Sequence, residues 1–97
     1  MSQAVSLTSR ARIPEGILFH VLQDELVVLN LNNGIYFGLD PVGTRIWQLI
    51  QGFPSHPLQR VVQALTEEYE VEEERCAQDL LNLVSCLQEN TLLEVSN

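Results

Sequence analysis

The stretch NNGIYFGLD, residues 32–40, joins a turn signal, a short apolar strand and the start of a helix. An Asn-Gly pair is typical of tight hairpins, because a type I′ turn needs positive φ at both central residues. Two more apolar runs, ILFHVL at 17–22 and ELVVLNL at 25–31, precede it and are separated by Gln23-Asp24. This pattern predicts two successive hairpins and hence a three-stranded meander, with residues 35–39 as a strand on its edge.

The residues after this stretch have the periodicity of helices. Asp40 is a good N-cap, Pro41 suits the first helical position, and Gly52 ends the helix. A second helix is predicted to begin near Pro57, and a third to span about residues 72–89. This order predicts an α+β fold, a three-stranded antiparallel sheet followed by three helices, similar to a winged helix-turn-helix.

The two ends of the chain give weaker signals. Residues 1–16 have neither strand nor helix period, so they predict an N-terminal arm that either lies against the domain at 17–97 or stays mobile. The closing Leu92, Leu93 and Val95 predict either a short strand or a cap on the core. No apolar run resembles a signal peptide or reaches the roughly 18 residues of a membrane span, so the sequence predicts a cytoplasmic protein.

The chain is strongly acidic, with thirteen Asp and Glu residues, five Arg and no Lys, and a net charge of -8. Nucleic acids and anionic membranes are bound chiefly through clustered cations, so this balance counts against both as partners. The third helix would also present Glu72, Glu73 and Glu74 at its N-terminal end. Their negative charge would repel DNA phosphates, which counts against a DNA-recognition helix. A neutral or basic peptide is the partner that the charge favours.

The sequence contains no recognisable catalytic or metal-binding motif. His20 and His56 stand alone, without an HExxH or CxxC motif or a second ligand at a suitable spacing. Cys76 follows three glutamates and an arginine, and Cys86 lies in an apolar stretch, so both are predicted to be reduced packing residues rather than nucleophiles. We therefore expect no enzyme activity, no catalytic residue, no metal and no cofactor.

The strand at 35–39 lacks the devices that usually protect a sheet edge, since it carries neither charge nor proline. Strand alternation places one set of its side chains on the core and leaves an aromatic ring beside a bare backbone on the other face. An extended peptide added to this edge would be held by main-chain hydrogen bonds. The alternatives are that Gly38 marks a bulge or that residues 92–95 cover the edge. The candidate binding residues in this strand are Ile35, Tyr36, Phe37, Gly38 and Leu39.

The predicted third helix is more apolar than a single contact with the core requires. Its apolar arc spans roughly 220°, whereas a surface helix normally needs a stripe only somewhat wider than 100°. Leu81 widens the stripe on one side and Cys86 on the other. The excess predicts a groove between this helix and the third strand. The alternative is a central helix that is wrapped by its own domain or by a dimer mate.

These residues resemble a known family. The run NNGIYFGLDPVGTRIWQLI, residues 32–50, followed by an apolar pattern that ends at Leu92-Leu93, is similar to the PqqD-like family. Its members are leader-recognition elements for ribosomally synthesised and post-translationally modified peptides (RiPPs). The resemblance spans about residues 17–95, and it implies that a precursor's leader peptide adds to the third strand and packs on the third helix. It also implies a rim for the leader at Arg75, Asp79 and Asn82.

The resemblance is greatest to stand-alone members of lasso-peptide clusters, which work beside a separate leader peptidase and a cyclase. It implies a non-catalytic adaptor that binds the leader peptide and delivers it to the leader peptidase and other maturation enzymes. Two alternatives remain open. One is PqqD proper, which serves quinone-cofactor synthesis beside a radical enzyme, and the other is a structural domain that forms a homodimer through its edge strand.

Overall fold

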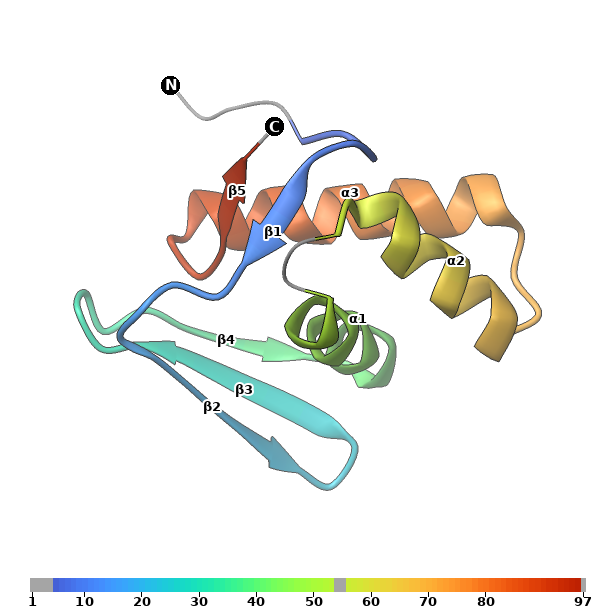
Figure 1. Cartoon of the computed structure of the whole chain (residues 1–97). Helices are drawn as coiled ribbons and strands as arrows, with labels where there is room; N and C mark the ends of the chain where they lie inside the picture. Colours follow the sequence, from blue (N-terminus) through green and yellow to red (C-terminus); the bar gives the residue numbers. More distant parts are fainter. Residues whose placement is uncertain (1–4, 54–55, 97) are drawn as a thin grey trace.

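The computed structural model describes residues 5–53 and 56–96, and within them it contains five strands and three helices (Figure 1). In chain order they are β1 (Arg10–Arg12), β2 (Ile17–Leu22), β3 (Glu25–Asn30), β4 (Tyr36–Leu39), α1 (Pro41–Gly52), α2 (Leu58–Glu68), α3 (Glu73–Glu89) and β5 (Glu94–Ser96). The predicted α+β order, a three-stranded sheet and then three helices, is confirmed. In the described part of the chain, no helix is both long and apolar enough to cross a bilayer.

The strands β2, β3 and β4 form an antiparallel sheet with β3 in the middle, as the two predicted hairpins require. β4 pairs with β3 from Tyr36 to Leu39, and no strand of the described residues pairs with its other side. The C-terminal residues do not cover this edge, because β5 pairs with β1 in a second, two-stranded sheet. The predicted edge position of the third strand is therefore confirmed.

The turn before β4 differs from the predicted two-residue type I′ turn. A 2.8 Å bond from Asn30 N–H to Ile35 O closes the hairpin, so four residues form its loop. Gly34, at 75°, is the residue of this loop that has a positive φ, whereas Asn33 does not. Ile35 N–H donates to Asn33 Oδ1 at 2.9 Å instead of continuing the ladder, so the strand begins at Tyr36, one residue later than predicted.

Part of the segment predicted as an N-terminal arm lies against the domain. β1 pairs with β5 in an antiparallel register that sets Ala11 opposite Val95, and Ala11 is buried. Leu58 N–H donates to Ser9 O at 2.8 Å, which satisfies an N–H group at the start of α2. Strands of three residues are too short to give a recognisable period, so the pair could not be predicted locally.

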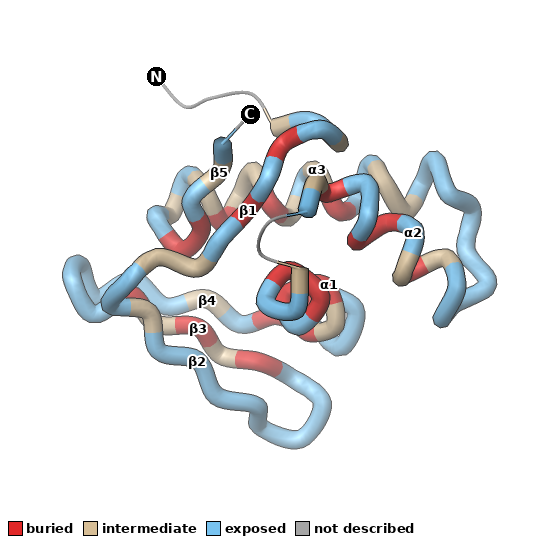
Figure 2. The backbone as a smooth tube through the Cα atoms, viewed as in Figure 1, coloured by how far each residue is buried: buried red, intermediate tan, exposed pale blue. Residues whose placement is uncertain are grey.

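The core lies between the main sheet and the three helices, and α1 sits directly on the sheet. Trp47 of α1 is fully buried and meets the ring of Phe19 of β2 in an edge contact, with 5.6 Å between the centroids. Asp40 caps α1 as predicted, and its side chain accepts from Gly43 N–H at 2.7 Å. Figure 2 shows buried residues on α1, β3 and the other helices, whereas β2 is exposed along almost its whole length.

Candidate functional site

The free edge of β4 presents two residues whose backbone groups face outward. In an antiparallel ladder, residues that bond to the neighbouring strand alternate with residues that bond away from it. The bond from Asn30 N–H to Ile35 O sets this alternation, so Phe37 bonds toward β3. The N–H and C=O groups of Tyr36 and Gly38 therefore point to the open side, where an added strand could pair with them.

Both ends of β4 are tied to the helical layer. At its end, the buried hydroxyl of Thr44 accepts from Leu26 N–H at 3.0 Å and donates to Leu39 O at 3.3 Å, in place of the last bond of the ladder. Before its start, Asn30 Nδ2 donates to Thr91 O at 2.9 Å, which holds the β3–β4 turn against the turn after α3. These bonds fix the position of the β4 edge relative to the helices.

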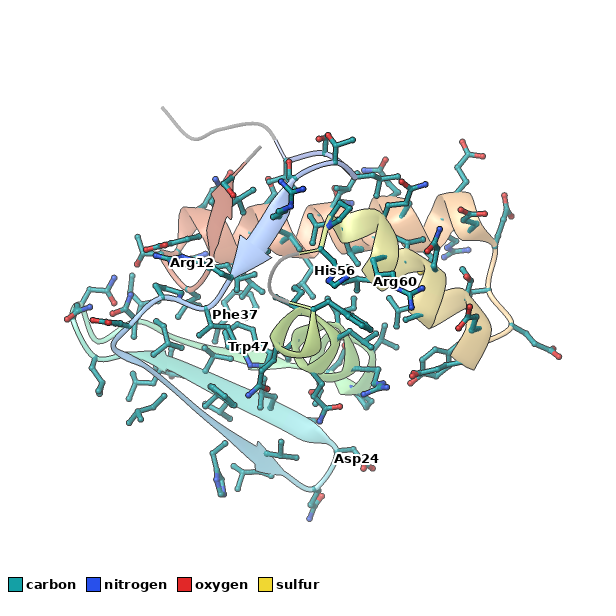
Figure 3. All side chains as sticks on the ribbon, viewed as in Figure 1. Arg12, Asp24, Phe37, Trp47, His56 and Arg60 are labelled. Atoms are coloured by element: carbon teal, nitrogen blue, oxygen red, sulfur yellow. The ribbon has the colours of Figure 1, made fainter. Side chains whose placement is uncertain are left out.

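A groove of about 410 Å³ lies between β4, the start of α1 and α3. The strand contributes Phe37, Gly38 and Leu39, and the facing flank of α3 contributes Asp79 and Leu83. Figure 3 shows Phe37 on the side of the sheet that faces the helices. A groove between the third strand and the third helix, which the sequence predicts, is therefore present.

An apolar pocket of about 150 Å³ opens off this groove between α1, α2 and α3. The groove and the pocket share Val42, Ile46 and Asp79. The pocket is also lined by Tyr69 and Val71, two large side chains that stay exposed to solvent. A cavity of about 150 Å³ accommodates a benzene ring. The pocket therefore suits one aromatic or large aliphatic side chain of a peptide.

Asp79 is the charged residue that the groove and the pocket have in common. Its side chain is exposed and forms no ion pair or hydrogen bond with the residues that the structure describes. Cys76 lines the same pocket, and its pKa is raised by burial and then by the carboxylates of Asp79 and Glu73. The thiol therefore stays protonated at neutral pH, unlike an activated nucleophile. Among the described residues, no three His, Cys, Asp or Glu side chains converge as metal ligands would.

The structure brings part of the predicted binding set together. Phe37, Gly38, Leu39 and Asp79 line the groove, and Arg75 lines the apolar pocket. The predicted strand residues Tyr36 and Ile35 are exposed, and Ile35 lies just before β4. The edge of β4 and one flank of α3 therefore form a single surface.

Three predicted residues of α3 are not among those that line this groove or the apolar pocket. Leu81 lines a separate depression beside the acidic start of α3. Asn82 Oδ1 accepts from Gln78 Nε2 at 3.1 Å, and Cys86 O accepts from the side chain of Asn90 at 2.8 Å. The flank that faces the groove instead carries Asp79 and Leu83, and Cys76 on the same flank lines the apolar pocket.

Sequence reasoning missed the contribution of α1. Val42 and Ile46 lie four residues apart, so they share one face of α1, and this spacing is the signal that could have identified them. Cys76, Asp79 and Leu83 follow a similar spacing on α3. Helical spacing groups each set of residues but does not reveal that the two sets face one another.

The outer face of the main sheet is a second apolar surface. The register sets Leu18 opposite Leu29 and Leu29 opposite Tyr36, so the three side chains form a row across the sheet. Leu18 and Leu22 are each 56% exposed, and Tyr36 is 74% exposed. All three helices lie on the other side of the sheet (Figure 1). Contiguous apolar surface of this kind is typical of an interaction site.

Known proteins resemble this chain in sequence and in structure. A family model described as Coenzyme PQQ synthesis protein D (PqqD) matches residues 25–93. The solved structure of TbiB1 in complex with the TbiA(beta) leader peptide is 35% identical, with a TM-score of 0.78 over 86% of this chain and 94% of that chain. A lasso peptide synthetase B1 complexed with the leader peptide is 29% identical, with a TM-score of 0.77 over 88% of this chain and 98% of that chain. No curated protein matches the chain.

Proposed function

The chain belongs to the PqqD family, and from this premise we propose that it binds the leader peptide of a RiPP precursor as a strand added to β4. The observation that carries the proposal is the unpaired edge of β4, where Tyr36 and Gly38 direct backbone groups to the open side and Gly38 also lines the groove beside α3. The two similar structures are complexes with leader peptides, which supports the same role for this chain.

Main-chain bonds alone would not give selective binding. Tyr36 and Gly38 offer four backbone groups, and each bond contributes about 0.5–1.5 kcal/mol net, against about 1–2 kcal/mol to order each peptide residue. Side-chain burial must therefore supply most of the affinity. The apolar pocket beside Ile46 and Tyr69 offers room for one anchor residue, and full burial of such a side chain contributes about 1.5–3 kcal/mol.

We assign the precursor to the lasso class, because one of the similar structures is a lasso peptide synthetase B1. The alternative is a role in quinone-cofactor synthesis, which the description of the matching family model favours. Binding assays with a lasso leader and with a quinone-cofactor precursor separate the two. Selective binding of the quinone-cofactor precursor would reverse our assignment.

The protein would serve as an adaptor without a catalytic role. A leader strand on β4 becomes the fourth strand of the sheet and extends its outer face beside Tyr36. We assign this apolar face, with Leu18 and Leu22 at its far side, to the leader peptidase or another maturation enzyme. One sheet would then hold the substrate at its edge and the enzyme on its face. Because the raised pKa of Cys76 keeps its thiol protonated, this cysteine of the apolar pocket is not an activated nucleophile.

Calorimetric titration with the cognate leader peptide tests the proposal. We expect saturable binding with a dissociation constant of about 10⁻⁵ M or lower, equivalent to about −7 kcal/mol. A scrambled peptide of the same composition is the control, because it keeps the charge and hydrophobicity but loses the placement of the anchor. Absence of saturable binding at about 10⁻⁴ M peptide would refute the proposed function.

A further inference from the structure

The strand β2 forms a second unprotected edge of the main sheet, opposite the groove. Its six residues, ILFHVL, include neither a charged side chain nor a proline, although natural sheets usually place such residues on an open edge. Four of its large side chains are exposed: Leu18 (56%), Phe19 (38%), Val21 (43%) and Leu22 (56%). In the described part of the chain, β3 is the only strand that pairs with β2.

The backbone groups that β2 directs outward belong to three residues. Leu31 N–H donates to Gly16 O at 2.8 Å, which fixes the alternation of the β2–β3 ladder. The even-numbered residues of β2 therefore bond to β3. The N–H and C=O groups of Ile17, Phe19 and Val21 point away from the sheet.

This edge is complementary to itself. If two copies run antiparallel about a two-fold axis at Phe19, Ile17 of each copy lies opposite Val21 of the other, and the two Phe19 residues face each other. All the outward groups then pair, in about six N–H···O bonds, and no like charges oppose one another within the strands. We propose that β2 is a homodimer interface, which joins the two sheets of a pair of molecules into one continuous sheet.

The two edges of the sheet suit different occupants. The edge of β4 opens into a groove whose far wall is α3, with Asp79 and Leu83, so it suits a single extended strand. β2 lies on the side of the sheet away from α3 (Figure 1), which leaves its edge open to the sheet of a second copy. Such a dimer would keep both β4 grooves free at its outer ends.

Charge and size predict how strong this dimer is. Each copy carries a net charge of -8, and Asp24 lies at the tip of the β2–β3 hairpin (Figure 3), near the second copy in this register. Salt screens such repulsion, so dimerisation should strengthen as the ionic strength rises. One strand pair is small beside the roughly 1,200–2,000 Å² buried in stable complexes, so we expect a dissociation constant of about 10⁻⁵–10⁻⁴ M.

Analytical ultracentrifugation of the full chain, from about 10⁻⁵ to 10⁻³ M, tests the proposal. We expect a monomer–dimer equilibrium that shifts toward dimer with added salt. Val21→Pro removes an outward N–H without touching the β2–β3 bonds, and it should weaken dimerisation at least about tenfold. A chain that stays monomeric up to about 10⁻³ M, or a dimer that Val21→Pro leaves intact, would overturn the proposal.

Disulfide trapping tests the register with the native cysteines Cys76 and Cys86 changed to serine. With Phe19→Cys, the paired Cα atoms would lie about 5.5 Å apart, within disulfide reach. With Leu22→Cys, the two sulfurs would lie about 20 Å apart, so this variant is the matched control. Cross-linking of the Phe19 variant alone supports the register, whereas no cross-linking, or equal cross-linking of both, contradicts it.

The dimer inference stands apart from leader binding. Val21 lies on the far edge from the groove, so Val21→Pro should leave the calorimetric affinity for the leader peptide within about twofold of wild type. A leader that does not bind to a chain that dimerises through β2 would refute the proposed function alone. A monomeric chain that binds the leader would refute the dimer alone.

Discussion

Gly38 carries one of the two backbone N–H groups that face the open edge of β4. Gly38→Pro removes this N–H and leaves the β3–β4 bonds in place, because Phe37 bonds toward β3 and Gly38 does not. We expect leader affinity to fall about tenfold, since one main-chain bond contributes roughly 0.5–1.5 kcal/mol and the ring also crowds the added strand. Calorimetry with the leader peptide measures the loss.

Gly38→Ala is the matched control for this substitution. A Cβ atom added at Gly38 meets no other atom within 4 Å, and the N–H group remains. Its leader affinity should therefore stay within about twofold of wild type. Equal losses in the alanine and proline variants would mean that bulk at this position, and not the missing donor, weakens binding.

Cys76 provides a chemical probe of the apolar pocket. Burial, and then the carboxylates of Asp79 and Glu73, raise its pKa above the usual 9.0, so its thiolate forms only at more alkaline pH than that of a free cysteine. Alkylation at neutral pH should therefore be slow and should accelerate as the pH rises through and beyond 9.0. In the unfolded chain, the Cys76 thiol ionises at its usual pKa of 9.0, which is lower than its pKa in the folded protein. The contribution of this thiol to stability is therefore complete below pH 9.0 and is lost as the pH rises through the folded-state pKa.

Saturating leader peptide should slow the alkylation of Cys76 at least about fivefold, because the anchor side chain would fill the pocket that Cys76 lines. Mass spectrometry of the alkylated peptides measures both cysteines in one sample. Cys86 lies outside the groove and serves as the internal control, with an unchanged rate. Protection of both cysteines would indicate a general tightening of the domain, and protection of neither would place the anchor elsewhere.

Sequence patterns predicted the strand wall of the groove but not its helix wall. The period of two assigns Phe37 and Leu39 to the inner face, because the direction of each strand residue follows from that of its neighbour. On α3, an apolar arc of roughly 220° means that either flank of the helix could form the wall of the groove. The structure turns the flank with Cys76 and Leu83 toward the groove, a choice that depends on how α3 packs against α1 and α2.

Among the elements, Thr44 joins the ends of β3 and β4 to α1. Thr44→Val keeps the shape of the side chain but leaves Leu26 N–H and Leu39 O without their partner in a buried position. We expect the free energy of unfolding to fall by about 1–3 kcal/mol. Thr66→Val is the control, because the Thr66 hydroxyl bonds at the surface of its own helix, and this change should cost less than about 0.5 kcal/mol. Urea unfolding followed by circular dichroism compares the two, and equal losses would contradict the role of Thr44.

The order of the elements could be predicted, whereas the pairing of β1 with β5 could not. Each strand has three residues, and the two come from opposite ends of the chain, so no local sequence period predicts them. Their pairing nevertheless decides a question that the sequence left open. Because β5 is held by β1, residues 94–96 do not cover β4, and the groove stays accessible.

At the scale of the whole molecule, one three-stranded sheet offers three separate surfaces. The edges of β4 and β2 are both unpaired, and the outer face is apolar and exposed. We propose a leader peptide for the first, a second copy for the second and a maturation enzyme for the third. Composition favoured a peptide-binding protein, and the match to the PqqD family supports binding of a leader peptide. Composition could not predict which apolar residues of the sheet belong to which surface, because that assignment depends on which strands lie at the edges and on which side the helices pack.

The outer face can be tested separately from the groove. Leu18→Lys places a charge on the apolar row that Leu18 forms with Leu29 and Tyr36, two strands away from the leader site. Leader affinity should stay within about twofold of wild type, whereas leader removal by the cognate peptidase should slow about tenfold, because a desolvated lysine opposes docking. Gln63→Lys adds the same charge to the exposed side of α2 and should change neither quantity. If both variants slow the peptidase equally, the added charge is responsible and its position is not. If Leu18→Lys has no effect, the enzyme docks on another surface.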